Sequence, residues 1–230
     1  MTTKVLIFDA SAIITLFLSD LSYILKELKK IFPGKFIITK EVEIEVVKSP
    51  MQIKRFQLEA LKVQELLIEK ILEYPSSLGI SDKEIKTQTS KVLEITNSTY
   101  FSNSESMKII HSGEASCIAL SYILNKKKID NALVIDERTT RMIAENPENL
   151  RRLFERKLHS QVRAKKENYD FCKDIKIIRS TELIMIALKR GIIKLPGASE
   201  RKIAALLYAA KYKGCSISFE EIDIAKNFSI

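Results

Sequence analysis

Short apolar segments, each about the length of one buried strand, alternate along this chain with longer segments of helical periodicity. We expect strands at 4–8, 36–39, 132–135 and 175–178. Runs of four or five β-branched and apolar residues are typical of strands that are covered on both faces. Strands that alternate with helices predict an α/β fold whose central sheet is mostly parallel.

The helical segments are expected to be long, and the chain is expected to carry a C-terminal addition. Apolar spacing predicts helices at 11–30, 52–74 and 149–166, the first of them capped by Ser11, and a polar loop at 96–106. We predict a domain over residues 1–170 and a helical C-terminal extension over 171–230. Whether that extension packs on the same domain is open.

The composition narrows the setting in which the protein works. The three cysteines are odd in number and lack a CxxC spacing, so neither a disulfide framework nor a zinc site is expected. A cytoplasmic location fits this cysteine usage best. The uncharged stretch 10–19 is too short to span a bilayer, and no membrane partner is expected. The net charge of +9 favours a polyanionic partner such as RNA.

Acidic residues follow the apolar strands at the places where ligands bind in parallel sheets. Asp9 ends the first strand and Asp136 ends the strand of LVIDE, while Glu45 and Glu114 lie on helices. Carboxyl ends of parallel strands meet at one sheet edge, so these groups can converge. An oxygen-only ligand set favours Mg²⁺ or Mn²⁺, which would offset the repulsion between them. Three of these acids also have a structural reading: Asp9 as a helix cap, Glu45 as a solvated side chain, and Glu114 as an acid favoured by the helix dipole.

Four segments follow one another in order within residues 4–146: IFDASAII, TKEVEIEVV, SGEASCIAL and LVIDERTTRMIAE. Together they resemble the PIN-domain family of metal-dependent ribonucleases. The resemblance implies a three-layer α/β/α PIN-like fold and an endoribonuclease, a hydrolase that cleaves RNA phosphodiesters through Mg²⁺- or Mn²⁺-activated water. It implies catalytic and metal-ligating roles for Asp9, Glu45, Glu114 and Asp136, and supporting roles for Ser11, Glu137 and Arg141.

A run of basic residues follows these acids. The segment RRLFERKLHSQVRAKK carries seven cations, and positions 152, 156 and 163 would lie near one stripe of a continuous helix. Such a run is either a solvated helix face or a track for an RNA backbone. The residues predicted to bind RNA are Arg151, Arg152, Arg156, Lys157 and Arg163.

Two other classes of protein compare with a nuclease: a phosphatase and an inactive binding module. A haloacid-type phosphatase would need a second aspartate where Ser11 stands. The main alternative is a catalytically weak or inactive PIN-like module that binds RNA or assembles with protein. The RNA target, the choice between a toxin–antitoxin pair and RNA maturation or decay, and the number of metal ions stay open. So do a homodimer and an antitoxin-like or RNA-processing protein partner.

Overall fold

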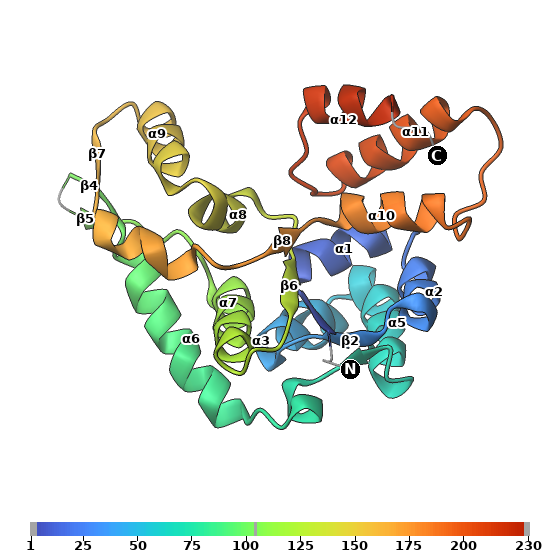
Figure 1. Cartoon of the computed structure of the whole chain (residues 1–230), viewed down its shortest axis with the longest axis horizontal. Coiled ribbons are helices and arrows are strands. Elements are labelled where there is room, and N and C mark those ends of the chain that lie inside the picture. The colour runs from blue at the N-terminus through green and yellow to red at the C-terminus, as the bar shows by residue number, and fades with distance from the viewer. Residues whose placement is uncertain (1–3, 104, 228–230) are drawn as a thin grey trace.

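The computed structural model describes residues 4–103 and 105–227, and its centre is a five-stranded parallel sheet (Figure 1). The strand order is β3-β2-β1-β6-β8. Strand β1 (Lys4–Phe8) lies between β2 (Gly34–Ile37) and β6 (Asn131–Val134), and β3 (Leu72–Glu73) and β8 (Ile177–Ile178) form the edges. The predicted α/β class and mostly parallel sheet are confirmed.

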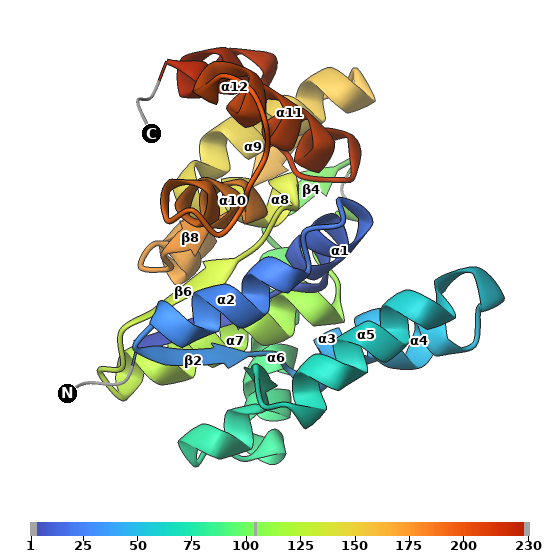
Figure 2. The ribbon, with the colours of Figure 1, turned by 90° about the vertical axis from the view of Figure 1, so that its right-hand side faces the viewer.

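Helices cover both faces of this sheet, which gives three layers (Figures 1 and 2). On one side lie α6 (Asp82–Asn97) and α7 (Ser112–Lys126); on the other lie α2 (Tyr23–Ile31) and α10 (Ser180–Lys189). The remaining helices and turns are α1 (Ala10–Leu18), α3 (Lys40–Glu43), the π-helical turn η1 (Ile44–Lys48), α4 (Ser49–Met51), η2 (Lys54–Phe56), α5 (Gln57–Ile68), η3 (Pro75–Leu78), α8 (Arg138–Glu145), α9 (Pro147–Leu158), η4 (Lys166–Cys172), α11 (Ser199–Tyr212) and α12 (Phe219–Lys226).

The core lies where the central strands meet these helices. Ile7 and Phe8 of β1 are fully buried, and the ring of Phe8 lies 5.2 Å from that of Phe36 on the neighbouring strand. Burial of one such side chain contributes about 1.5–3 kcal/mol to the free energy of unfolding. The strand that ends at Asp9 is therefore held in a fixed position.

A second sheet corrects the predicted loop at 96–106. Strands β4 (Tyr100–Ser102), β5 (Glu105–Ser106) and β7 (Val162–Ala164) pair antiparallel in the order β5-β4-β7. Strand β4 pairs with a segment some 60 residues further along the chain (Phe101 with Arg163). The polar residues of 96–106 do not reveal that a distant strand pairs with this segment.

Several predicted helices were too long. The helix expected at 11–30 is broken between α1 and α2, where Asp20 takes a left-handed φ of 57°, and its cap is Asp9 rather than Ser11. The helix expected at 52–74 is reduced to α5, and the chain then enters β3. The helix expected at 149–166 ends at Leu158, because His159 turns the chain with a φ of 48° into β7.

The C-terminal residues join the same sheet. Strand β8 pairs with β6, so the segment beyond residue 170 supplies one sheet edge as well as helices α10, α11 and α12. The backbone N–H of Ser216 also donates to the carbonyl of Asp136 at 3.1 Å. Within the described ranges, no helix combines the length and apolar character that crossing a membrane requires.

Candidate functional site

Asp9 lies where β1 ends, and only one of its carboxylate oxygens is used. Its Oδ2 accepts hydrogen bonds from the Ser11 backbone N–H at 2.9 Å and from the Ser11 hydroxyl at 2.5 Å, which caps α1. The residue is only 2% exposed, and its Oδ1 is buried without a hydrogen-bond partner among the described residues. A buried carboxylate oxygen usually has a partner, so an unpaired one is a place where a water, an ion or a ligand would bind.

Glu45 reaches the first turn of α7 from η1. Its carboxylate packs so closely on Gly113 that a Cβ built on this glycine would lie 2.4 Å from Glu45 Oε1. The glycine therefore provides space for the glutamate. Single π-helical turns are frequent at functional sites, and this one carries Glu45.

Glu114 lies in the first turn of α7, where it also has a structural role. Its carboxylate accepts a hydrogen bond from the backbone N–H of His111 at 3.0 Å, as in a capping box. Both readings of this residue therefore have support, because it caps α7 and also lies near Asp9 and Glu45.

Burial and neighbouring charges raise the pKa values of Asp9 and Glu45. Burial, with a contribution from the charge of Glu114, raises the pKa of Asp9 to about 6 against the opposing hydrogen bonds from Ser11. The pKa of Glu45 is raised to about 7, mainly by burial and further by the negative charges of Asp9 and Glu114. The site thus has excess negative charge that a cation would offset. In the part of the chain that the structure describes, however, no group of three or more acidic, histidine or cysteine side chains is arranged to hold a metal as it stands.

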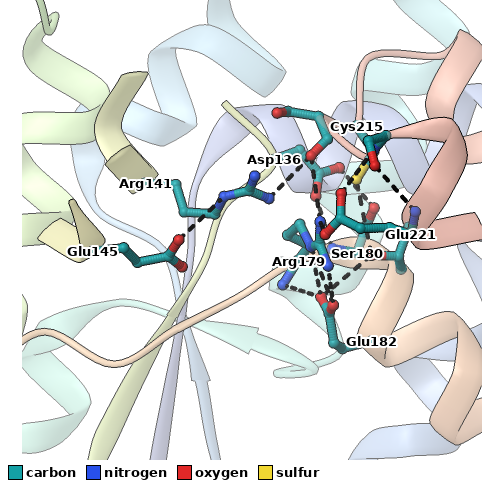
Figure 3. A network of polar contacts seen from close by, with 11 residues as sticks. Asp136, Arg141, Glu145, Arg179, Ser180, Glu182, Cys215 and Glu221 are labelled. Atoms are coloured by element: carbon teal, nitrogen blue, oxygen red, sulfur yellow. Dashed lines mark hydrogen bonds and ion pairs between the residues drawn. The ribbon is translucent and has the colours of Figure 1, made fainter. Parts of the chain in front are cut away.

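Asp136 is turned toward α10 (Figure 3). Its Oδ1 accepts from the Ser180 backbone N–H at 2.8 Å, and its Oδ2 accepts from the Ser180 hydroxyl at 2.7 Å. Its own backbone N–H donates to the Ser11 hydroxyl at 3.0 Å, so Ser11 links the ends of β1 and β6. The structure therefore brings together Asp9, Glu45 and Glu114, whereas the Asp136 carboxylate holds the start of α10.

The other two predicted supporting residues also hold secondary structure in place. Glu137 caps α8 by accepting from the backbone N–H groups of Thr139 and Thr140 at 2.8 and 2.7 Å. Arg141 donates to the carbonyl of Ser216 at 3.0 Å and lies 3.7 Å from Glu145 (Figure 3).

Arg179 was not anticipated from the sequence. It forms ion pairs with Glu182 and Glu221, both at 2.7 Å, and so connects α10 to α12 (Figure 3). Glu221 lies 42 residues beyond Arg179, so no local spacing indicates this contact.

The basic residues predicted to bind RNA do not form one stripe. Arg151 is held by Glu148 and Glu155 and donates to the carbonyl of Val162, so its charge is used internally. Arg152, Arg156 and Lys157 are exposed on α9. Arg163 lies on β7, so the prediction that positions 152, 156 and 163 share one helical face was wrong.

Comparisons with family models, curated proteins and solved structures found no match to this chain.

Gly113→Ala is expected to weaken Mn²⁺ binding by about tenfold or more, because it displaces the proposed ligand Glu45. Even the loss of a group that only supports a metal ligand typically costs 10- to 100-fold in affinity. The added methyl group would collide with Glu45 Oε1 and force this side chain away. Isothermal titration with Mn²⁺ measures the effect. Ser112→Ala is the matched control, because the neighbouring Ser112 is exposed and the same helical turn is kept. Equal Mn²⁺ affinity in Gly113→Ala and wild type would contradict the placement of Glu45 in the site.

Ser180→Ala is expected to lower the free energy of unfolding by about 1.5–3 kcal/mol, the usual contribution of a hydrogen bond to a charged group. The substitution removes the hydroxyl that donates to the buried Asp136 carboxylate. Urea unfolding measures the loss. Ser90→Ala, at an exposed hydroxyl that bonds to the carbonyl of Lys86, should change stability by no more than about 0.5 kcal/mol. A loss in Ser180→Ala no larger than in this control would show that Asp136 does not depend on Ser180.

Proposed function

We propose that the protein is a PIN-type, Mg²⁺- or Mn²⁺-dependent endoribonuclease. The observation that carries the proposal is the buried Oδ1 of Asp9, which has no hydrogen-bond partner in the described part of the chain and lies beside Glu45 and Glu114. All three acids lie in the segments that resemble PIN domains. Their position at the carboxyl end of β1 and the start of α7 is where parallel α/β sheets bind ligands.

The donor chemistry supports a hard divalent cation. Carboxylate oxygens are the ligands that Mg²⁺ prefers and usually supplements with water. Asp9 Oδ1 would be the fixed ligand, since Ser11 holds the other oxygen in place. Glu45 and Glu114 would complete the protein's share through small side-chain movements, and Asp136 would take part only by leaving Ser180. When bound, the cation supplies Lewis-acid chemistry: it activates water and offsets the charge of a phosphodiester.

The proposal also includes a partner and a cellular location. RNA is the expected polyanionic partner, because the net charge is +9. A cytoplasmic location is inferred from three cysteines that are all free and buried.

Cleavage of a single-stranded RNA with and without divalent cation tests the proposal. We expect cleavage with Mn²⁺ or Mg²⁺, none with a chelator, and products with 5′-phosphate and 3′-hydroxyl ends. Products ending in 2′,3′-cyclic phosphate would mean that the ribose hydroxyl attacks the phosphodiester, and the proposed water chemistry would be wrong.

A second candidate is an inactive PIN-like module that binds RNA or assembles with protein. Two observations favour it: both oxygens of Asp136 are bound by Ser180, and Glu114 caps α7. This candidate predicts RNA binding that is unaffected by Mn²⁺ and no cleavage under any metal condition.

A further inference from the structure

The small sheet β5-β4-β7 has one face anchored to the protein. Tyr100 and Val162 point inward and are buried. The Tyr100 hydroxyl donates to the carbonyl of Pro147 at 2.8 Å, and its ring packs edge-on against Phe154 of α9 at 5.6 Å. The position of this sheet is thus fixed by contacts on its inner face.

The outer face of the same sheet carries a different set of side chains. Phe101 of β4 lies directly opposite Arg163 of β7, so their side chains share one face. Successive residues of a strand point to opposite faces, which places Gln161 and Lys165 on the side of Arg163. The pairing continues to Lys165, whose backbone N–H donates to the carbonyl of Thr99 at 2.8 Å.

These residues line a surface cavity of about 440 Å³. That volume lies within the range of about 300–1,000 Å³ that is usual for small-molecule sites. The lining residues are Phe101, Asn103, Gln161, Arg163, Ala164 and Lys165. This described set combines one aromatic ring, two amides and two cations, and it contains no acid.

We propose that this cavity binds one nucleotide of a single-stranded nucleic acid. The base would stack on Phe101, a contribution that tolerates any base. The amides of Asn103 and Gln161 can donate to and accept from a base edge. Arg163 and Lys165 would bind the adjoining phosphates. The Lys165 ammonium lies 5.1 Å from the Phe101 ring centroid and is on a flexible stem, so it can move to a phosphate when a base arrives.

The inference deepens the proposed function by naming how its substrate is held, and it rests on that function for the choice of RNA over DNA and for the relation to the bond that is cut. Strand β5 ends at Ser106 and α7 begins at Ser112, so this segment spans at most about 20 Å. Phe101 pairs with Ser106, so a strand held at this cavity would be within reach of the start of α7, where Glu114 lies. The site would therefore recognise an unpaired segment flanking the bond to be cut.

Fluorescence anisotropy with a labelled twelve-nucleotide RNA, in a chelator so that no cleavage occurs, tests the inference. Phe101→Ala is expected to weaken binding by about fivefold or more, the loss expected when one stacked base is released. Phe101→Tyr should keep wild-type affinity because it retains the ring. Tyr23→Ala, at an exposed aromatic residue on α2, is the matched control and should bind like wild type.

The salt dependence of binding and the comparison of single-stranded with duplex RNA give a second, independent test. Arg163→Gln should flatten the dependence of log Kd on log salt by about 0.7, one single-strand phosphate contact, whereas Lys62→Gln on α5 should not. Duplex RNA of the same sequence should bind more weakly than the single strand, because its bases are stacked. DNA of that sequence should bind more weakly than RNA, and equal binding would overturn the choice of RNA as the occupant.

The inference is overturned if Phe101→Ala binds the single strand as tightly as wild type, or if the wild-type protein binds no single strand. Because binding is measured without metal, a failure of cleavage does not decide it. Conversely, loss of the Phe101 effect would leave metal-dependent cleavage at Asp9 untouched.

Discussion

Asp9→Asn is expected to abolish RNA cleavage and, at the same time, to stabilise the metal-free protein at pH 8 by about 3 kcal/mol. The stability figure follows from the pKa of Asp9, which burial raises from 3.8 to about 6, at about 1.4 kcal/mol per pKa unit. The asparagine oxygen can still accept from Ser11, while its amide replaces the unpartnered Oδ1. Cleavage should fall by more than about 100-fold, since loss of a ligand should exceed loss of an outer partner.

The sign of the stability change depends on pH. The folded state binds the Asp9 proton more tightly than the unfolded state, so this group lowers stability as pH rises from about 4 to about 6. Below pH 4 the variant and wild type should therefore be equally stable, and the gap should open up to about pH 6. Urea unfolding across this range measures it. Asp20→Asn, which removes a carboxylate at an exposed position, is the control. A variant no more stable than wild type at pH 8 would contradict the account.

Mn²⁺ is expected to stabilise the wild-type protein much more at pH 8 than at pH 5. The pKa values of Asp9 and Glu45 are raised to about 6 and about 7, so at pH 5 protons compete with the cation. At a hundred times its dissociation constant, a ligand adds about 2.7 kcal/mol. Thermal unfolding with and without Mn²⁺ measures the difference at each pH.

The same experiment on Asp9→Asn provides the control, since this variant should gain nothing from Mn²⁺ at either pH. Equal stabilisation of wild type at pH 5 and pH 8 would show that the cation binds elsewhere. A gain in the variant that matches wild type would lead to the same conclusion.

The central strands could be predicted because their signal is local. Runs such as 4–8 and 132–135 are apolar enough to be strands in any buried setting. The breaks in the helices were not predictable in this way. Asp20 and His159 adopt left-handed conformations that end α1 and α9, although neither residue is a glycine. Strand β4 forms because β7 lies beside it, and that partner is remote in sequence.

The candidate site was also predictable only in part. Asp9, Glu45 and Glu114 were expected together because strand ends and helix starts meet at one sheet edge, and the raised pKa values of Asp9 and Glu45 reflect this proximity in part. The orientation of Asp136 depends on Ser180, 44 residues further along, which no spacing near Asp136 reveals. Gly113 offered an overlooked signal, because glycine in a helical turn often marks close approach by another group.

Crystals of the wild-type protein soaked in Mn²⁺ at pH 8 test the central claim most directly. The account predicts anomalous density that contacts Oδ1 of Asp9 and a carboxylate oxygen of Glu45 or Glu114, and no such density in Asp9→Asn. Its absence from wild-type crystals, or a Mn²⁺ ion bound only at another place, would contradict the assignment of these three residues as a metal site.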